Sequence, residues 1–215
     1  DPAHAEEFGK LMVQDMDGRI KPINTLASEF LRKVHGRSSF KVTRGDYTAK
    51  LSSDQVFLMM NVNPLIWQQV PIIKIDPNGG KEILEVIPKR EDKYYAFLDF
   101  LDKEGNYLLS EMVDAASRKK PAAQNAFDKE LIKVDERFNV LNGVFNGFYL
   151  KIFPKPNDST NSWYSPYDTY DLAHDDSVLV SGMMKLYVGG VQEGIATGNW
   201  TNADKVVDLI SAYQR

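Results

Sequence analysis

The feature that most limits how this chain can fold is a regular series of apolar residues between Pro121 and Pro154. Successive members are separated alternately by four and three positions, a heptad spacing that places them along one face of an α-helix. A one-sided stripe of this kind is more typical of a core than of a ligand groove. We therefore predict a long central helix over about residues 122–153, with the stripe buried. Its members are Phe127, Leu131, Val134, Phe138, Leu141, Phe145, Phe148 and Ile152.

Two further helices are predicted after this one, over about residues 177–197 and 202–214, with a short break at residues 198–200. We expect the long central helix to pack on this C-terminal helical pair. The predicted fold class is therefore mostly α with a minor α+β part: a helical domain with one or two small β-hairpins.

The first hairpin is predicted at the start of the chain, where residues 11–14 and 19–21 flank an Asp-Gly pair. Glycine accepts the positive φ angles of a tight hairpin turn, and proline can end a strand without leaving a donor unpaired. Gly18 and Pro22 are thus expected to be structural residues, and Thr25 is expected to cap the helix that follows, although Asn24 could do so as well.

The region between this helix and the long one holds weaker signals. After a basic loop, Ser52, Ser53 or Asp54 is expected to cap a short helix that ends near Met60. A second hairpin is expected between residues 72–75 and 83–87, because the segment 76–80 is dense in turn-forming residues. A helix over residues 93–101 is expected to follow.

Size and composition favour one folded domain. The chain has 215 residues, no cysteine and a formal net charge of -4. We predict a single soluble domain over 1–215, with a possible subdivision near 120 into a hairpin and helix part, 1–120, and a helical part, 121–215. The first residue is not Met and the last lies in a predicted helix, so we expect a piece excised from a larger protein.

Several classes of function are excluded by composition. The acidic balance argues against a nucleic-acid binder, and no apolar run approaches the roughly 20 residues of a membrane-spanning helix. The absence of cysteine removes disulfides and thiolate catalysis. No phosphate-binding, dinucleotide-binding, zinc-protease or serine-hydrolase signature occurs, so we assign no catalytic residue.

One cluster has the composition of a metal site. Asp168, Asp171 and His174 lie close together in the sequence and offer oxygen and imidazole ligands. The alternative is structural, because Asp175 and Asp176 stand at the start of the next helix, where carboxylates favour the helix N-terminus.

Two segments have the composition of partner-binding surfaces. The stretch from residue 19 to residue 50 holds eight basic and two acidic residues, a charge of +6, whereas the rest of the chain sums to -10. It can receive anionic groups such as lipid phosphates or the propionates of haem, or it can simply be solvated. An aromatic loop can recognise a partner or fold back over the long helix. The candidate residues are Arg19, Lys21, Arg32 and Lys33 in the basic stretch and Trp163 and Tyr164 in the loop.

Four segments resemble one protein family. They are HAEEFGKLMVQD at residues 4–15, GRIKPINTLASEFLRK at 18–33, DQVFL at 54–58 and NPLIW at 63–67. Together they resemble the extracytoplasmic soluble region of bacterial system II cytochrome c biogenesis proteins of the fused ResB/CcsA type. The resemblance is clear over roughly the first 75 residues.

The resemblance implies a membrane-anchored parent that exports haem and attaches it to apocytochrome c. It implies an extracytoplasmic, periplasmic location with a membrane surface nearby, and partners that are the rest of the parent protein and apocytochrome c, with no nucleic acid. The tryptophan-rich haem-handling motif of the family is absent, and none of the three histidines matches a haem ligand of the family. No cofactor is therefore assigned to the chain itself, and haem is expected only through the parent.

Two functions from different classes follow. The first is a non-catalytic scaffold or partner-docking domain of the cytochrome c synthase, which would not be an enzyme by itself. The alternative is a periplasmic domain that binds haem or a metal, or is hydrolytic, at a site of its own. Such a site needs a pocket in which a histidine converges with other polar groups.

Overall fold

The computed structural model describes residues 1–170 and 172–215. Within them the chain is mostly helical, and the strands form two-stranded antiparallel pairs, which confirms the predicted fold class. Contacts divide the chain into two compact units. The first unit comprises residues 1–31, 38–62 and 143–215, and the second comprises residues 32–37 and 63–142. Residue 120 therefore lies inside the second unit.

The first unit opens with helix α1 (Pro2–Lys10) and the predicted hairpin of β1 (Met12–Gln14) and β2 (Ile20–Pro22). Gly18 has a φ of 83°, a value that glycine adopts without strain. Pro22 ends the strand as predicted. Helix α2 (Ile23–His35) follows at once, so the prediction that Thr25 caps it is wrong. Because no linker separates strand and helix, Thr25 lies in the first turn, where its hydroxyl donates to the Asn24 side chain.

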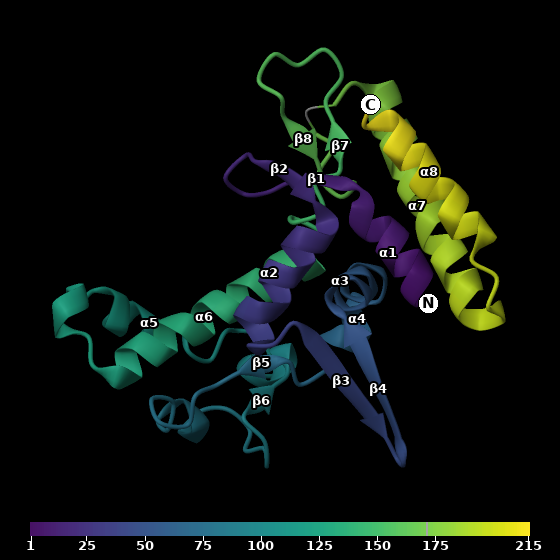
Figure 1. The fold of residues 1–215 in the computed structure, drawn as a ribbon. Coiled ribbons are helices and arrows are strands. Elements are labelled where there is room, and N and C mark those ends of the chain that lie inside the picture. Colours follow the sequence, from purple (N-terminus) through teal and green to yellow (C-terminus); the bar gives the residue numbers. More distant parts are fainter. Residues whose placement is uncertain (171) are drawn as a thin grey trace. The chain divides into compact units, whose positions relative to one another are not determined.

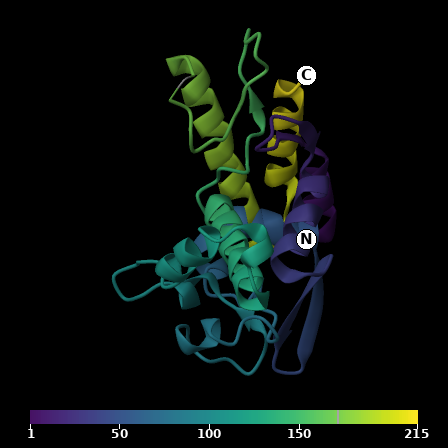
Figure 2. The ribbon, with the colours of Figure 1, turned by 90° about the vertical axis from the view of Figure 1, so that its left-hand side faces the viewer.

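A second hairpin of the first unit replaces the predicted basic loop. Strands β3 (Ser39–Arg44) and β4 (Tyr47–Ser52) pair over six positions and extend as a two-stranded arm (Figures 1 and 2). Helix α3 (Ser53–Val62) follows β4 directly. The backbone N–H of Gln55 donates to Ser52 Oγ at 3.2 Å, and the N–H of Ser52 donates to Gln55 Oε1 at 2.9 Å. This reciprocal capping box confirms a cap at Ser52.

The C-terminal part of the first unit contains the predicted helical pair. A short strand pair, β7 (Phe153–Pro154) and β8 (Trp163–Tyr164), precedes it. Helices α7 (His174–Thr197) and α8 (Thr201–Tyr213) then lie side by side (Figure 1), and α1 packs on α8 and on α3. No helix of the described residues is both long enough and apolar enough to cross a membrane, and this includes α7, which has 24 residues.

The second unit differs most from expectation. Its regular elements are α4 (Pro64–Trp67), β5 (Ile73–Lys74), β6 (Tyr94–Tyr95), α5 (Ser110–Ser117) and most of α6 (Ala126–Phe145). The predicted hairpin partner 83–87 is wrong, because β5 pairs with β6 and Ile83–Glu85 is a 3-10 turn. The helix expected over 93–101 is only the 3-10 turn Phe97–Phe100 after β6. A third such turn, Pro121–Ala123, precedes α6.

The heptad stripe is buried over the middle of the helix, whereas Phe127 and Phe145 near its two ends are only partly buried, which departs from the prediction. Leu131, Val134, Phe138 and Leu141 are all at most 6% exposed. The helix ends at Phe145, because Gly147 takes a φ of 72° that an L-residue adopts only with strain. Phe148 is therefore rotated out of the stripe and is 51% exposed, so its predicted burial is wrong. Helix α6 lies mainly in the second unit and the α7–α8 pair in the first, and the packing between them stays a prediction.

A buried ion pair joins three segments of the second unit. Arg137 Nη1 lies 2.9 Å from Glu130 Oε1 and donates to the carbonyl of Lys74 at 2.6 Å, while its Nε donates to the carbonyl of Lys33 at 3.3 Å. Glu130 Oε1 also accepts from the backbone N–H of Asp76 at 2.9 Å. The pair thus supplies hydrogen-bond partners to the carbonyls of Lys33 and Lys74 and to the N–H of Asp76.

Candidate functional site

The most connected polar group of the first unit is His4, in the first turn of α1. The Asp1 side chain caps this helix by accepting from the His4 backbone N–H at 3.0 Å, and Pro2 suits the first helical position. The cap sets the rotation of the helix, so His4, Ala5 and Phe8 all face the core.

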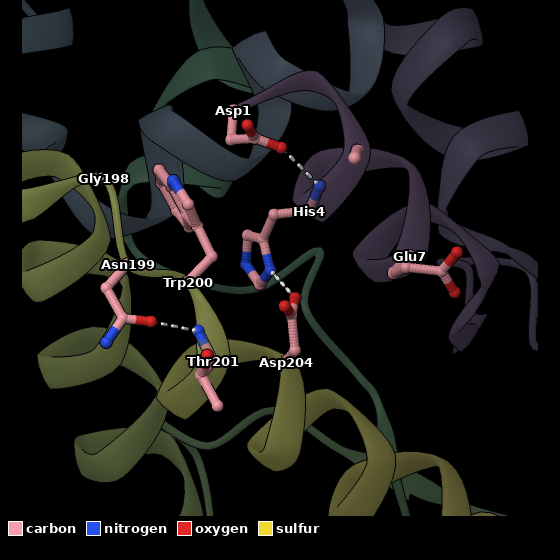
Figure 3. Close-up of a pocket in the computed structure, with 9 residues that line it drawn as sticks. Asp1, His4, Glu7, Gly198, Asn199, Trp200, Thr201 and Asp204 are labelled. Atoms are coloured by element: carbon pink, nitrogen blue, oxygen red, sulfur yellow. Dashed lines mark hydrogen bonds and ion pairs between the residues drawn. The ribbon is translucent and has the colours of Figure 1, made fainter.

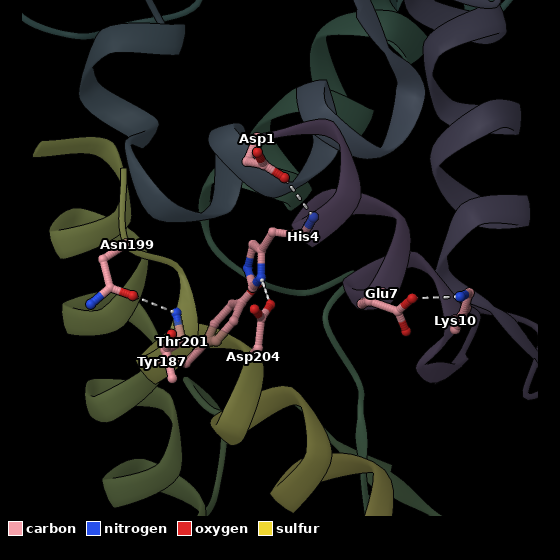
Figure 4. Close-up of polar contacts among 8 residues, drawn as sticks. All are labelled: Asp1, His4, Glu7, Lys10, Tyr187, Asn199, Thr201 and Asp204. Carbon is pink, nitrogen blue, oxygen red and sulfur yellow. Dashed lines mark hydrogen bonds and ion pairs between the residues drawn. The ribbon is translucent and has the colours of Figure 1, made fainter. Parts of the chain in front are cut away.

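The imidazole of His4 has a polar partner at each nitrogen (Figure 4), and an aromatic ring stacks on one of its faces. Nδ1 lies 2.7 Å from Oδ1 of Asp204 on α8, and Nε2 lies 3.0 Å from the hydroxyl of Tyr187 on α7. The ring of Trp200, from the α7–α8 connection, stacks on the imidazole at a centroid distance of 4.9 Å. One side chain of α1 thus contacts both helices of the pair and the turn between them.

A hollow of about 390 Å³ adjoins this contact (Figure 3), and we call it the His4 hollow. Its rim carries three carboxylates, which would repel the propionates of a haem. The residues around it are Asp1, Ala3, His4, Glu7, Gly198, Asn199, Trp200, Thr201 and Asp204.

The geometry of the His4 hollow suits a contact that stabilises the packing of α1 better than it suits catalysis. A histidine held by a carboxylate on one nitrogen can act as a base on a hydroxyl at the other, but only where a substrate can reach that hydroxyl. Both nitrogens of His4 are engaged, and Tyr187 is 1% exposed. Burial, and then the charge of Asp204, raise the pKa of Tyr187 well above its ordinary value, so the phenol stays protonated. His4 therefore locks α1 onto the helical pair.

Sequence reasoning missed this site because it treated His4 as a residue at a terminus. The signal was present in the helix start Asp1-Pro2, which fixes a cap and hence a buried face shared by His4 and Phe8. The partners Tyr187 and Asp204 could not be found, because nothing local in the sequence relates them to α1.

A second hollow, of about 340 Å³, is lined by the predicted aromatic loop and by the first hairpin, without Arg19 or Lys21. We call it the Trp163 hollow. The Gln14 side chain organises it: Nε2 donates to the carbonyls of Gly18 at 3.2 Å and Asn161 at 2.9 Å, and Oε1 accepts from the N–H of Trp163 at 3.0 Å. The lining residues are Gln14, Met16, Phe148, Lys151, Ser162, Trp163, Tyr164, Ser165 and Asp168.

The aromatic loop contributes to this hollow, and its predicted role in recognition stays a prediction. Trp163 is 8% exposed and forms a wall of the hollow, while Tyr164 is half-buried beside it. Met16 and Phe148, on the rim, are 59% and 51% exposed. The hollow therefore presents apolar surface to solvent between the opposite charges of Lys151 and Asp168.

The two basic residues of the first hairpin have different surroundings. Lys21 Nζ lies 3.0 Å from Asp15 and 2.8 Å from Glu29, and its side chain is only 21% exposed. Burial alone would raise the pKa of Asp15, but hydrogen bonds from Lys21 and from two backbone N–H groups hold it below its ordinary value. Arg19 is 78% exposed and reaches only Asp17, at 3.5 Å. Lys21 is thus a structural residue, and Arg19 is available to a partner.

We expect Lys21→Ala to lower the free energy of unfolding by about 1 kcal/mol, because it leaves Asp15 without its cation. That corresponds to a fall in melting temperature of about 2–4 °C for a chain of this size. Arg19→Ala is the matched control and should leave the melting temperature within about 1 °C. Equal losses in a thermal melt of the two variants would contradict the assignment.

The other candidate residues are not gathered into one site. Arg32 and Lys33 are exposed in the second unit, where Lys33 Nζ lies 3.0 Å from Glu136. Asp168 borders the Trp163 hollow and His174 is the exposed first residue of α7, whereas Asp171 lies outside the described residues. Among residues 1–170 and 172–215, no three acidic or histidine side chains are placed to hold a metal ion.

His35, the last residue of α2, is 7% exposed in the second unit. Its Nδ1 lies 3.3 Å from the carbonyl of Ile72, and its ring lies 4.2 Å from that of Tyr94. Burial lowers the pKa of His35 below the ordinary 6.5, and the charges of Arg37 and Lys74 act in the same direction. The buried imidazole is therefore neutral, which does not fit the imidazolium that a helix C-terminus would favour.

The lowered pKa of His35 predicts a loss of stability in acid. Below pH 6.5 the unfolded chain binds a proton that the folded chain does not, so the free energy of unfolding falls as the pH drops through that value. Denaturant titrations between pH 7.5 and 5 should show a smaller fall for His35→Gln than for the unmodified chain. His174→Gln, at an exposed position, is the control and should behave as the unmodified chain does. The prediction is wrong if both variants keep the same pH dependence.

Comparison with known proteins gives one informative relative. The chain is 38% identical to Protein NrfI of Wolinella succinogenes over 156 residues, which are 73% of this chain and 16% of the relative. The chain thus spans less than a fifth of that protein's length. No family model matches the chain. The similarity supports the resemblance to system II cytochrome c biogenesis proteins, but not the fused ResB/CcsA type.

Proposed function

We propose that this chain is a partner-docking domain of a membrane-anchored cytochrome c maturation protein, on the extracytoplasmic side, and that it performs no chemistry of its own. The relation to Protein NrfI carries the proposal. The haem export and attachment expected of the parent would belong to its other parts, and the fused ResB/CcsA arrangement remains part of the proposal. The partner is apocytochrome c or the rest of the parent protein.

The Trp163 hollow supports docking through its mixture of apolar and polar groups. A rim of exposed Met and Phe above a buried Trp is the composition of an interface core, since aromatic residues and Met are enriched there. Met16 adapts its shape, and Phe148 and Trp163 offer rigid faces to an apolar or aromatic side chain. Lys151 and Asp168 at the rim can pair with the ends of an extended peptide segment. Arg19, on the same hairpin as Met16, adds an exposed cation.

The alternative of a haem-binding domain finds no fitting ligand among the histidines. His4 has both nitrogens engaged beside three carboxylates, His35 is buried against Ile72 and Tyr94, and His174 stands exposed at a helix start. These residues do not form a haem site, and we derive no step through haem in this chain.

The docking proposal is tested in the full-length parent. The double variant Met16→Ser and Phe148→Ser should lower the amount of cytochrome c carrying covalent haem by about tenfold, since interface anchors of this kind are each worth about 1 kcal/mol or more. The matched control is Leu65→Ser and Ile66→Ser, which changes two apolar residues that are 73% and 62% exposed in the second unit. Haem staining of the mature cytochrome gives the readout.

Melting temperatures of the 215-residue chain accompany this assay, so that a folding defect is recognised. Normal cytochrome c maturation in the Met16 and Phe148 variant, with the protein present at its normal level, would contradict the proposed docking surface. Equal losses of haem-carrying cytochrome c in both double variants would show that the effect does not depend on the Trp163 hollow.

A further inference from the structure

The β3–β4 hairpin continues beyond the core of the first unit. In the register of its strands, Phe40 lies opposite Leu51, Val42 opposite Ala49, and residue 44 opposite Tyr47. Because side chains alternate between the faces of a hairpin, those of Phe40, Val42, Tyr47, Ala49 and Leu51 share one face. Phe40 is buried at the base, but Val42 is 38% and Tyr47 70% exposed. An apolar strip thus runs out of the core into solvent.

The opposite face of the hairpin is basic. It carries the pairs Ser39–Ser52, Lys41–Lys50 and Thr43–Thr48. Lys41 and Lys50 are directly opposite, exposed, and without an ion pair to any residue that the structure describes. Like charges at directly opposite positions destabilise a hairpin. Over residues 39–52 three basic residues and one acidic residue, Asp46, give a net charge of +2 in a chain whose total is -4.

We propose that the β3–β4 hairpin docks on the surface of an anionic phospholipid bilayer. The outer end of the hairpin would meet the bilayer, with Lys41 and Lys50 on one face toward the lipid phosphates and the side chains of Tyr47 and Val42 on the other face in the headgroup region. The inference rests on the proposed position of the chain beside a membrane. It adds to the proposed function an assignment of the surface through which the chain contacts the lipid.

Lipid fits the hairpin better than a protein partner does. Each lysine near an anionic membrane surface contributes about 1 kcal/mol, which offsets the repulsion between Lys41 and Lys50. Tyrosine is enriched at membrane interfaces, where its apolar ring and polar tip are both accommodated. The hairpin carries these two features on the two faces of one protruding arm (Figure 1), and an acidic protein surface that paired with the lysines would leave the apolar strip on the other face without a partner.

The experiment measures sedimentation of the full 215-residue chain with vesicles of phosphatidylcholine alone or mixed with phosphatidylglycerol. We expect binding to the mixed vesicles that weakens as salt is raised. The double variant Lys41→Thr and Lys50→Thr should bind about twentyfold more weakly, a factor of about five for each lysine. Tyr47→Ser should weaken binding about fivefold.

The control variant Lys81→Thr and Lys89→Thr makes the same change of charge at two exposed lysines of the second unit, and it should bind within about threefold of the unmodified chain. Thermal melts should show that Lys41→Thr and Lys50→Thr leaves the fold intact or slightly stabilised, because like charges are removed.

Three outcomes would overturn the inference. The first is absence of binding to anionic vesicles, and the second is equal loss in the two lysine variants. The third is unchanged vesicle binding together with self-association of Lys41→Thr and Lys50→Thr, which would show that the lysines protect exposed strand edges instead. The assay contains no cytochrome, so its failure leaves the docking test at the Trp163 hollow unaffected.

Discussion

Replacing Phe138 with alanine should lower the free energy of unfolding by about 3–5 kcal/mol, the range for removing a buried phenylalanine. The Phe138 ring stacks on Phe97 at 4.5 Å and on Tyr107 at 4.3 Å, with Phe100 at 5.8 Å, so truncation removes the centre of an aromatic cluster. Alanine is a good helix former, so the loss reflects packing alone.

The matched control is Phe148→Ala, from the same heptad series. Because Phe148 is 51% exposed, its truncation should change the free energy of unfolding by less than about 1 kcal/mol. Chemical denaturation of the two variants gives the comparison. Similar losses would show that the stripe is buried along its full length and that the helix end at Phe145 is misplaced.

Arg137→Ala should cost about 3–5 kcal/mol, because it leaves the buried Glu130 carboxylate without its cation. Glu130 is 5% exposed, and the carbonyls of Lys33 and Lys74 would lose a donor as well. Lys133→Ala is the control: its Nζ lies 4.0 Å from the same carboxyl group, but its side chain is 62% exposed, so the loss should stay below about 0.5 kcal/mol.

A double variant separates the ion pair from its surroundings. Glu130→Ala with Arg137→Ala should cost less than the sum of the two single changes, since neither charge is then left unpaired. Additive losses measured by denaturation would mean that the two side chains contribute independently.

The parts of the fold that sequence reasoning predicted are those encoded locally. The Asp17-Gly18 turn, the cap at Ser52 and the buried residues from Leu131 to Leu141 each depend on neighbours within a few positions. The predictions were wrong where segments that are distant in the sequence compete for the same pairing partner. Ile73 pairs with Tyr95 rather than with the apolar run at 83–87, because pairing is decided by the packing of the whole unit.

The candidate sites, too, could be predicted only where the signal is local in the sequence. Trp163 and Tyr164 could be selected from composition, but their meeting with Met16 depends on Gln14, whose contacts cross the chain. Lys21 and Arg19 looked equivalent in sequence, and only the positions of Asp15 and Glu29 distinguish them. His4 had no sequence signature beyond its capped helix.

The contact between His4 and Asp204 spans 200 positions, and it has a consequence for biosynthesis. Ribosomes add about 5–20 residues per second, so α1 emerges about 10–40 s before α8 can receive it. During that interval Ala5 and Phe8, both 1% exposed in the folded chain, have no partner on α7 or α8. The nascent N-terminal segment therefore exposes these two side chains until α8 has been synthesised.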